Sequence, residues 1–209
     1  SQSWRGDTAT VVVDRRLQGH GLLSVDHHGG AALAAEHLIG LGHRRIALLT
    51  GSATVLPSTE RLAGYRQAHQ EAKIEVDPAL IRPHMQGANT AFSSVCQLLQ
   101  MTKPPTAIIS LGTSMLADVL EAITSNGLRY PQDVSLVSSG DTDLARHATP
   151  AITALSWDMN EVGRTAARLL LERIRNADEP GSSEPVFLPT RLILRHSCAA
   201  PAAPARGRK

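Results

Sequence analysis

Short runs of apolar and β-branched residues alternate along this chain with longer stretches in which apolar residues recur every three or four positions. The first pattern is typical of buried strands and the second of helices that cover one face of a sheet. The main predicted strands are T-V-V-V, I-A-L-L-T, T-A-I-I-S, V-S-L-V-S-S and I-T-A-L, at 10–13, 46–50, 106–110, 134–139 and 152–155. Their alternation with helices predicts an α/β fold with a parallel sheet and helices on both faces.

Helices are predicted between and after these strands, and glycine ends two of them. Gly42 and Gly127 each follow a last helical turn, where a left-handed residue commonly stands. Asn89 is a predicted N-cap, because its side chain accepts hydrogen bonds from the amides of a first turn. The predicted helices cover 29–41, 59–76, 91–100, 114–126 and 160–176. Shorter strands are predicted at 24–26 and 80–83 and around V-F-L and L-I-L near the C-terminus.

Three polar loops, 50–58, 110–114 and 138–143, each follow a predicted strand. Parallel sheets bind ligands beyond the carboxyl ends of their strands, so these loops are the candidate site. Arg61 lies in the predicted first turn of the next helix, where a cation is unfavourable by roughly up to 1 kcal/mol. Two interpretations stay open: a solvated surface charge, or a side chain that points at an anionic or hydroxyl-rich group.

The composition is that of a soluble globular chain. Of 209 residues, 42% are apolar and 19% are charged, and no apolar run approaches the roughly 20 residues that a membrane helix needs. The formal charge of +2 includes a basic tail at 206–209, so it gives no strong indication of nucleic-acid binding. Cys96 and Cys198 form no CxxC motif, which fits a reducing compartment. The chain begins without Met and almost directly at a strand, which is typical of a fragment.

The candidate motifs for catalysis and metal binding do not match the known patterns in spacing or in the elements around them. G-H-G-L-L-S at 19–24 lacks the third glycine of a dinucleotide fingerprint and opens no helix. G-T-S-M-L at 112–116 lacks the closing glycine of a nucleophile elbow, and Ser114 is predicted to be a helix N-cap instead. The spacing of Asp26-His27-His28 and His37 matches no standard metal pattern. We therefore expect no metal and no cofactor, although residues distant in sequence can still form a triad.

Several segments in this order and spacing resemble one family. They are V-V-V-D-R-R-L, S-V-D, E-H-L-I-G-L-G-H-R-R-I-A-L-L, R-L-A-G-Y-R, P-P-T-A-I-I-S, N-G-L-R-Y-P-Q-D-V-S-L-V, T-P-A-I-T and E-V-G-R-T-A-A-R-L-L-L-E-R-I. Together they resemble the effector-binding core of the lactose/purine repressor (LacI-type) family of bacterial transcription regulators. The resemblance runs from about residue 10 to residue 197.

The resemblance implies a periplasmic-binding-protein-like (type I) fold, with two doubly wound parallel-sheet lobes, a ligand cleft between them and three chain crossings. The crossings are expected near Asp26, near 156–158 and near residue 183. The expected lobes are 1–26 with 158–183, lacking its opening strands and helices, and 27–157 with 184–197, followed by a disordered tail at 198–209. The helix-turn-helix head of the family is missing from this chain.

Site residues follow from the resemblance position by position. Asp26 occupies the place of an acidic residue that faces the ligand, and Arg61 that of the arginine that clamps the effector. A guanidinium suits this role because its planar fork of donors stays charged when it is desolvated. Trp157 stands where the family often has Gln. It is expected either to form an aromatic wall of the site or to pack between the lobes.

Other candidate positions depart from the family. Ser139 is a further candidate ligand contact. Next to it, Gly140 replaces the usual pocket aspartate, and Ile109, also in the candidate set, replaces an aromatic residue that often stacks on the ligand. G-T at 112–113 replaces the usual Asn-Asp. Because the two glycines leave room and few donors, we expect a ligand that is bulkier or more apolar on one side than a simple hexose, or a weak site.

The resemblance also implies a cytoplasmic homodimer, formed through the helix at 116–123 and the loop at 143–147. The expected contact residues are Leu116, Ala117, Leu120, Ile123 and Arg146. A sugar or sugar derivative would bind and modulate DNA binding by the missing head. The alternative is a periplasmic solute-binding protein of a sugar transporter, which shares the fold. An enzyme on this fold is a third possibility, but no set of candidate catalytic residues supports it.

Overall fold

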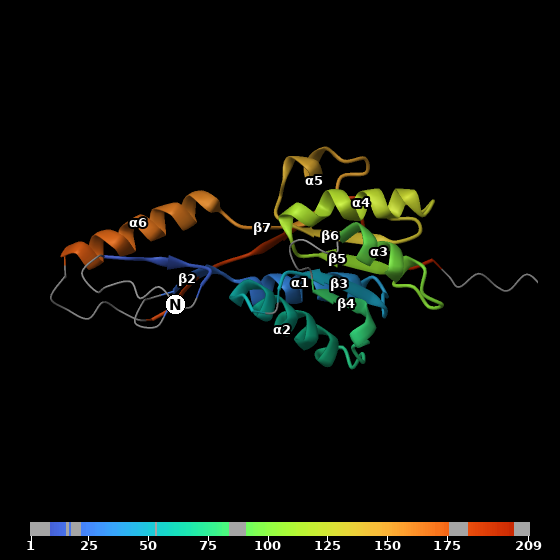
Figure 1. Ribbon diagram of the computed structural model, residues 1–209, viewed down its shortest axis with the longest axis horizontal. Coiled ribbons are helices and arrows are strands. Elements are labelled where there is room, and N and C mark those ends of the chain that lie inside the picture. Colours follow the sequence, from blue (N-terminus) through green and yellow to red (C-terminus); the bar gives the residue numbers. More distant parts are fainter. Residues whose placement is uncertain are drawn as a thin grey trace, which may run out of the picture. The chain divides into compact units, whose positions relative to one another are not determined.

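The computed structural model describes residues 9–15, 17, 22–52, 54–83, 91–175 and 184–202 (Figure 1). The chain forms two compact units. Unit 1 comprises Ser1–Asp26 with Trp157–Pro189, and unit 2 comprises His27–Ser156 with Thr190–Lys209. Each unit is therefore built from two separate segments of the sequence.

Unit 1 contains a parallel three-stranded sheet in the order β1-β2-β8. The strands are β1 (Val12–Val13), β2 (Leu22–Val25) and β8 (Val186–Leu188). Because β8 pairs with β2, residues 184–189 belong to unit 1. Trp157 and 184–197 were expected in the other lobe, and this boundary is corrected for Trp157 and for 184–189. The third crossing lies between Pro189 and Thr190, so the expected crossing near residue 183 is wrong.

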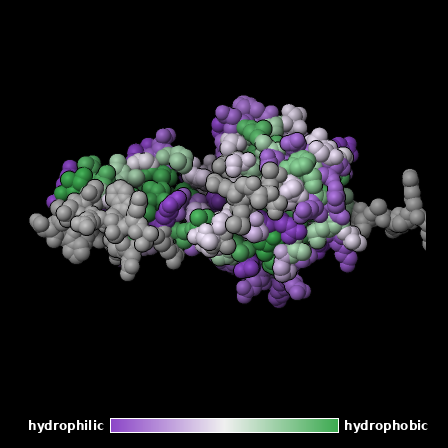
Figure 2. All heavy atoms as spheres, viewed as in Figure 1, coloured by the Kyte–Doolittle hydropathy of each residue, from purple (hydrophilic) through white to green (hydrophobic). Residues whose placement is uncertain are grey.

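The helix of unit 1 is α6 (Met159–Arg175), and much of its apolar surface is exposed. Within α6, Thr165 is the buried residue, whereas Leu171 and Ile174 are more than half exposed. Figure 2 shows apolar surface over this helix. A cavity of about 150 Å³ lies in the same unit, lined by Val11, Leu22, Leu169, Arg173, Glu184, Pro185 and Val186.

Unit 2 is built on a six-stranded sheet in the order β4-β3-β5-β6-β7-β9. The strands are β3 (Ile46–Thr50), β4 (Ile81–Pro83), β5 (Ala107–Ser110), β6 (Ser135–Ser139), β7 (Thr153–Ser156) and β9 (Arg191–Ile193). All pairs are parallel except β7 with β9. Every residue of β3, β5 and β6 is buried, as expected for parallel strands covered on both faces. The predicted α/β fold is confirmed.

Helices cover both faces of this sheet, as Figure 1 shows for α2 and for α3 with α4. They are α1 (His27–Gly40), α2 (Leu56–Glu71), α3 (Ala91–Leu99), α4 (Leu116–Ser125) and α5 (Asp143–His147). Ala47, Ile108 and Leu136 are register partners that share one sheet face. They belong to the same core cluster as residues of α3 and α4. On the other face α1 and α2 pack against each other.

Two predicted caps need comment. Ser114 is not the N-cap of α4, because it lies in the 3₁₀ turn η2 (Thr113–Met115) and Met115 takes the cap position. Asn89, the predicted cap of α3, lies outside the described residues.

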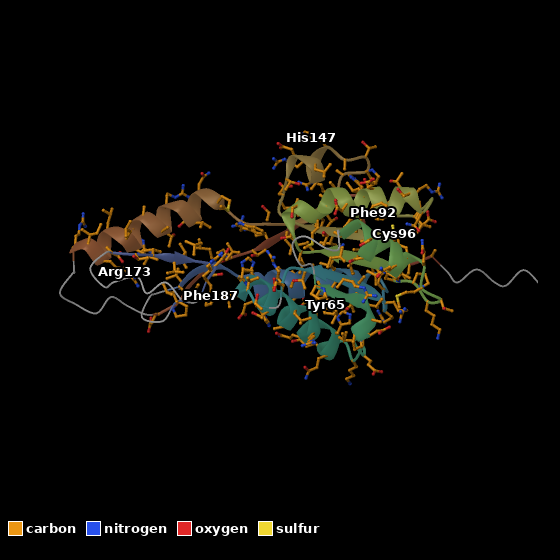
Figure 3. The ribbon with its side chains drawn as sticks, in the orientation of Figure 1. Tyr65, Phe92, Cys96, His147, Arg173 and Phe187 are labelled. Atoms are coloured by element: carbon orange, nitrogen blue, oxygen red, sulfur yellow. The ribbon has the colours of Figure 1, made fainter. Side chains whose placement is uncertain are left out.

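The contact of α1 with α2 depends on a glycine. A Cβ on Gly64 would lie 2.0 Å from the backbone oxygen of His28, so only glycine lets the two helices approach this closely. The next residue, Tyr65, is buried and points from α2 towards the sheet (Figure 3). Its hydroxyl donates a 2.8 Å hydrogen bond to the backbone oxygen of Ile46 in β3. Together these contacts fix the position of α2 on the sheet.

The residues after β9 are ordered against unit 2. The Nε2 atom of His43 lies 2.8 Å from the backbone oxygen of Ala199, and its Nδ1 lies 2.8 Å from Thr106 Oγ1. The Ala199 amide donates to Ser135 Oγ at 3.0 Å. The expected disordered tail at 198–209 is therefore wrong for 198–202, because buried polar partners hold this segment. Residues 203–209 lie outside the described part of the chain.

Candidate ligand-binding site

The candidate site of unit 2 lies where three neighbouring parallel strands end. β3, β5 and β6 are adjacent in the sheet, and Leu49, Ser110 and Ser138 are register partners near their ends. Because the strands run in the same direction, the loops that follow them leave the sheet at one edge. The residues of these loops are the ones that can meet a common ligand.

Arg61 reaches across this edge. The helix α2 begins at Leu56 rather than at the predicted residue 59, because Pro57 is compatible with a first turn. Arg61 therefore lies in the second turn. Its Nη1 donates a 2.6 Å hydrogen bond to the backbone oxygen of Leu111, after β5, and its Nη2 lies 3.5 Å from the Oγ of Ser139, in β6. The structure thus brings together two of the predicted site residues, Arg61 and Ser139.

Gly140, which follows Ser139, has a left-handed backbone conformation with φ of 84°. Its amide donates to the backbone oxygen of Leu155 at 2.9 Å. Residues with a side chain are strained in this conformation, whereas glycine is not. The backbone conformation by itself therefore favours glycine at this position.

Asp141, which follows Gly140, does not replace the missing pocket aspartate as a ligand contact. Its carboxylate accepts hydrogen bonds from Arg195 Nη2 at 2.6 Å and from Arg146 Nη1 at 3.2 Å. The side chains of Asp141 and Arg195 are only 17% and 16% exposed, so this pair is largely desolvated. A carboxylate held by two guanidinium groups is already satisfied, and Asp141 is therefore a structural residue of the β6 loop.

The space beside Gly112 is filled. A Cβ on Gly112 would lie 2.8 Å from both Sδ and Cε of Met115, whose side chain is 5% exposed. The expectation of free room at this position is therefore wrong. Methionine is flexible and apolar, and here it occupies the volume that a larger residue at 112 would need.

Ile109 is not available to a ligand in this structure. Its side chain is fully buried in the central strand β5, where its register partners are Leu48 and Val137. Its assignment to the ligand-binding set is therefore corrected: it is a core residue.

Asp26 and Trp157, the other predicted ligand contacts, lie in unit 1. Asp26 follows β2, is partly buried and donates its backbone amide to the oxygen of Leu188 at 2.7 Å. Trp157 is partly buried, and its Nε1 lies 3.1 Å from the Sδ of Met159. Their roles towards a ligand stay predictions.

Buried hydroxyl groups at this edge of the sheet were not among the predicted site residues. Within the described residues, the hydroxyls of Thr50, Ser58, Ser110 and Ser138 are buried and have no hydrogen-bond partner. An unpaired buried hydroxyl is destabilising by roughly 1–3 kcal/mol. The available signal was a polar residue at the end of each apolar strand, as in I-A-L-L-T and T-A-I-I-S. Three of the four lie in or at the ends of β3, β5 and β6.

No metal site is evident in the ranges that the structure describes, where no group of three or more His, Cys, Asp or Glu is placed to hold an ion. Burial lowers the pKa of His37, which was one of the residues considered for such a site. None of the helices in the described ranges combines the length and apolar character needed to cross a membrane.

The predicted dimer face is only partly exposed. Leu116 and Ile123 are 2% and 0% exposed and belong to the core of unit 2, so they cannot meet a partner chain. Ala117 is exposed, and Leu120 is partly buried against the same core. Arg146 is exposed and pairs with Asp143 at 2.7 Å. The helical period turns Leu116 and Ile123 inward, which leaves Ala117, Leu120 and Arg146 as candidates.

Comparison with known proteins assigns the family. A profile described as periplasmic binding protein-like domain matches residues 35–198. The chain belongs to this family. The HTH-type transcriptional repressor PurR of Escherichia coli O1:K1 / APEC is 36% identical over 196 residues, which are 93% of this chain and 53% of that protein. The ribose operon repressor of Haemophilus influenzae is 32% identical over 168 residues, which are 80% of this chain and 50% of the repressor.

Solved structures agree with this assignment. A transcriptional regulator CelR–cellobiose complex superposes with a TM-score of 0.81 at 30% identity, covering 90% of this chain and 58% of that chain. A transcriptional regulator LacI from Bacillus cereus subsp. cytotoxis has a TM-score of 0.80 at 28% identity, covering 87% of this chain and 64% of that chain. The predicted LacI-type membership is confirmed. The chain spans about half the length of the curated relatives that it matches.

Proposed function

We propose that this chain is the effector-binding core of a LacI-type transcriptional regulator, with a sugar or sugar derivative as effector. The observation that carries the proposal is Arg61, which reaches from α2 to Leu111 and Ser139 at the ends of two neighbouring parallel strands, β5 and β6. A cationic, partly buried fork of donors at this edge suits a hydroxyl-rich or anionic small molecule. The relatives are named as repressors and regulators, which favours a regulator over a transport protein.

In this proposal the effector acts by shifting an equilibrium. It binds one conformation of the protein more tightly than another, and only this difference in affinity changes DNA binding. The DNA-binding head lies outside this chain, and a homodimer forms through Ala117, Leu120 and Arg146 of α4 and α5. The cytoplasm is the proposed location, because DNA is read there. No catalytic step is included.

Isothermal titration calorimetry with cellobiose and ribose, followed by a wider sugar panel, tests the proposal. For a sugar that binds, Arg61→Gln removes a charge-assisted contact worth roughly 1.5–3 kcal/mol, so the Kd rises about tenfold to more than a hundredfold. Arg66→Gln is the matched control, because Arg66 is exposed on the same helix and its loss changes the charge equally. Equal affinities for wild type and Arg61→Gln would assign Arg61 a structural role and reject the site.

A further inference from the structure

Two neighbouring serines lie buried in the two central strands of the unit 2 sheet. Ser110 in β5 and Ser138 in β6 are register partners, and they are 0% and 1% exposed. Within the described residues, the Oγ atom of each is buried and has no hydrogen-bond partner. Register partners on adjacent parallel strands project to the same face and lie about 4.8 Å apart. Two unpaired hydroxyl groups are therefore neighbours inside the protein.

The pair lies on the face of the sheet that α3 and α4 cover (Figure 1). Side chains two positions apart along a strand share a face. Ser110 follows Ile108 by two positions, and Ser138 follows Leu136 in the same way. Ile108 and Leu136 belong to the core cluster that contains residues of α3 and α4. Arg61 belongs to α2 on the other face, so the serine pair is separate from the Arg61 contacts.

The side chains on either side of the pair are apolar. Leu49 is the register partner of Ser110, and Ala154 is the register partner of Ser138. Both belong to the same core cluster. These neighbours offer no hydrogen-bonding group, and a buried hydroxyl without a partner is destabilising. Because the large majority of buried polar side chains in native proteins have a partner, the unpaired state of both hydroxyls needs an explanation.

The spacing of the two serines suits one bridging water molecule. A water lies about 2.8 Å from each hydroxyl that it bonds, so it spans oxygen atoms about 4.5–5.5 Å apart, which is close to the spacing of neighbouring strands. Ser110, Ser138 and Ala154 are also three small residues in succession across the sheet, which lowers the side-chain volume in this row. Buried waters bind at polar sites with room for about one water molecule.

We propose that a single buried water molecule binds between Ser110 and Ser138 and bridges their hydroxyl groups. One hydroxyl donates a hydrogen bond to the water, and the water donates to the oxygen of the other. The bridge joins the carboxyl ends of β5 and β6. Leu111 and Ser139, the residues that Arg61 contacts, follow directly, so the same water helps to hold the partners of Arg61 in place. The inference does not depend on which effector binds.

A double-mutant cycle in the full chain tests the bridge. Ser110→Ala and Ser138→Ala should each lower the Tm by about 2–4 °C, because the water loses one of its partners. The double variant should lower the Tm by no more than the larger single effect, since the two serines share one water.

Hydroxyls that bind no water give the opposite sign. Each substitution would then remove an unpaired buried group and leave the Tm unchanged or higher, and this result would overturn the inference. Losses that add in the double variant would also overturn it, because each hydroxyl would then have a partner of its own.

Two further serines calibrate the cycle. Ser197 is buried in the same unit, and its Oγ donates to the backbone oxygen of Leu136 at 2.6 Å and accepts from the amide of Thr153 at 2.8 Å. Ser197→Ala should therefore lower the Tm at least as much as either single variant. Ser125 is exposed at the end of α4, and Ser125→Ala should leave the Tm unchanged or slightly higher.

A crystal structure of the wild-type chain, at a resolution that shows ordered water, tests the inference without any substitution. We expect one water molecule within about 3 Å of both Oγ atoms. A direct hydrogen bond between the two hydroxyls, or an apolar side chain in the space between them, would reject the water site.

Discussion

Replacing Gly64 with alanine tests the packing that places Arg61. An alanine Cβ at this position would lie 2.0 Å from the backbone oxygen of His28, whereas real contacts of this kind exceed 3.0 Å. The helices α1 and α2 must therefore separate by about 1 Å, because a backbone atom of a packed helix cannot rotate away. Arg61 lies three residues earlier on α2, so the same movement pulls its guanidinium from the Leu111 oxygen.

The expected loss of stability is the difference of two terms. Overpacking a close contact destabilises by roughly 1–3 kcal/mol, and a clash with backbone belongs at the upper end. Alanine is about 1 kcal/mol more favourable than glycine inside a helix, which offsets part of this. The free energy of unfolding should therefore fall by about 2 kcal/mol, which lowers the Tm by about 4–8 °C for a chain of this size.

Urea unfolding followed by circular dichroism at 222 nm measures this change. Gly40→Ala is the control in the same unit, because Gly40 is exposed near the end of α1 and a Cβ there has no heavy atom within 4 Å. The control should be unchanged or slightly stabilised. If Gly64→Ala is as stable as the control, the close approach of α1 and α2 is not a feature of the folded protein.

Three further predictions concern pH, backbone strain and assembly. Burial lowers the pKa of His43, so the unfolded state binds protons more readily and stability should fall as the pH drops below about 6.5. The His43→Asn variant should have a lower free energy of unfolding than wild type at pH 8, and this free energy should change less between pH 7 and pH 5. Urea unfolding at several pH values measures it, and an unchanged dependence of the free energy of unfolding on pH would contradict the prediction. Gly140→Asp places an L side chain at φ of 84° and should lower the free energy of unfolding by about 1–2 kcal/mol without any ligand. Unchanged stability would show that this loop can adjust. Ala117→Glu should shift a dimer towards monomer in analytical ultracentrifugation, whereas Gln97→Glu on the exposed side of α3 should not. Equal masses for the two variants would reject the α4 interface.

The strands and most helices could be predicted because their signal is local. The predicted strand I-A-L-L-T coincides with β3, and T-A-I-I-S matches β5 to within one residue. A buried parallel strand is apolar along its whole length, so the pattern alone marks it. The start of α2 was missed because Pro57 is equally compatible with a loop and with a first helical turn. The assignment of β8 to unit 1 was not predicted, because the sequence of a three-residue strand does not indicate which sheet the strand joins.

The candidate site was harder, because its contacts join distant parts of the chain. Arg61 and Ser139 were both candidates, but their hydrogen bond spans 78 positions and has no local signature. Met115 fills the volume beside Gly112, and Ile109 faces the core, although both lie next to predicted ligand loops. Likewise, the apolar positions of α4 include both core and surface residues. Apolarity gives the face of a helix but not what covers it.

The sequence by itself determined the alternation of strands and helices, the parallel sheet and the LacI-type family, because these depend on the order and spacing of residue types. Only the tertiary structure decided which carboxylates and hydroxyls are free at the strand ends. Asp141 is taken by Arg195 and Arg146, whereas the hydroxyls of Ser58 and Thr50 have no hydrogen-bond partner. Whether a polar group can bind a ligand depends on the hydrogen-bond partners within about 3 Å of it. These partners come from distant parts of the chain, so they are known only from the tertiary structure.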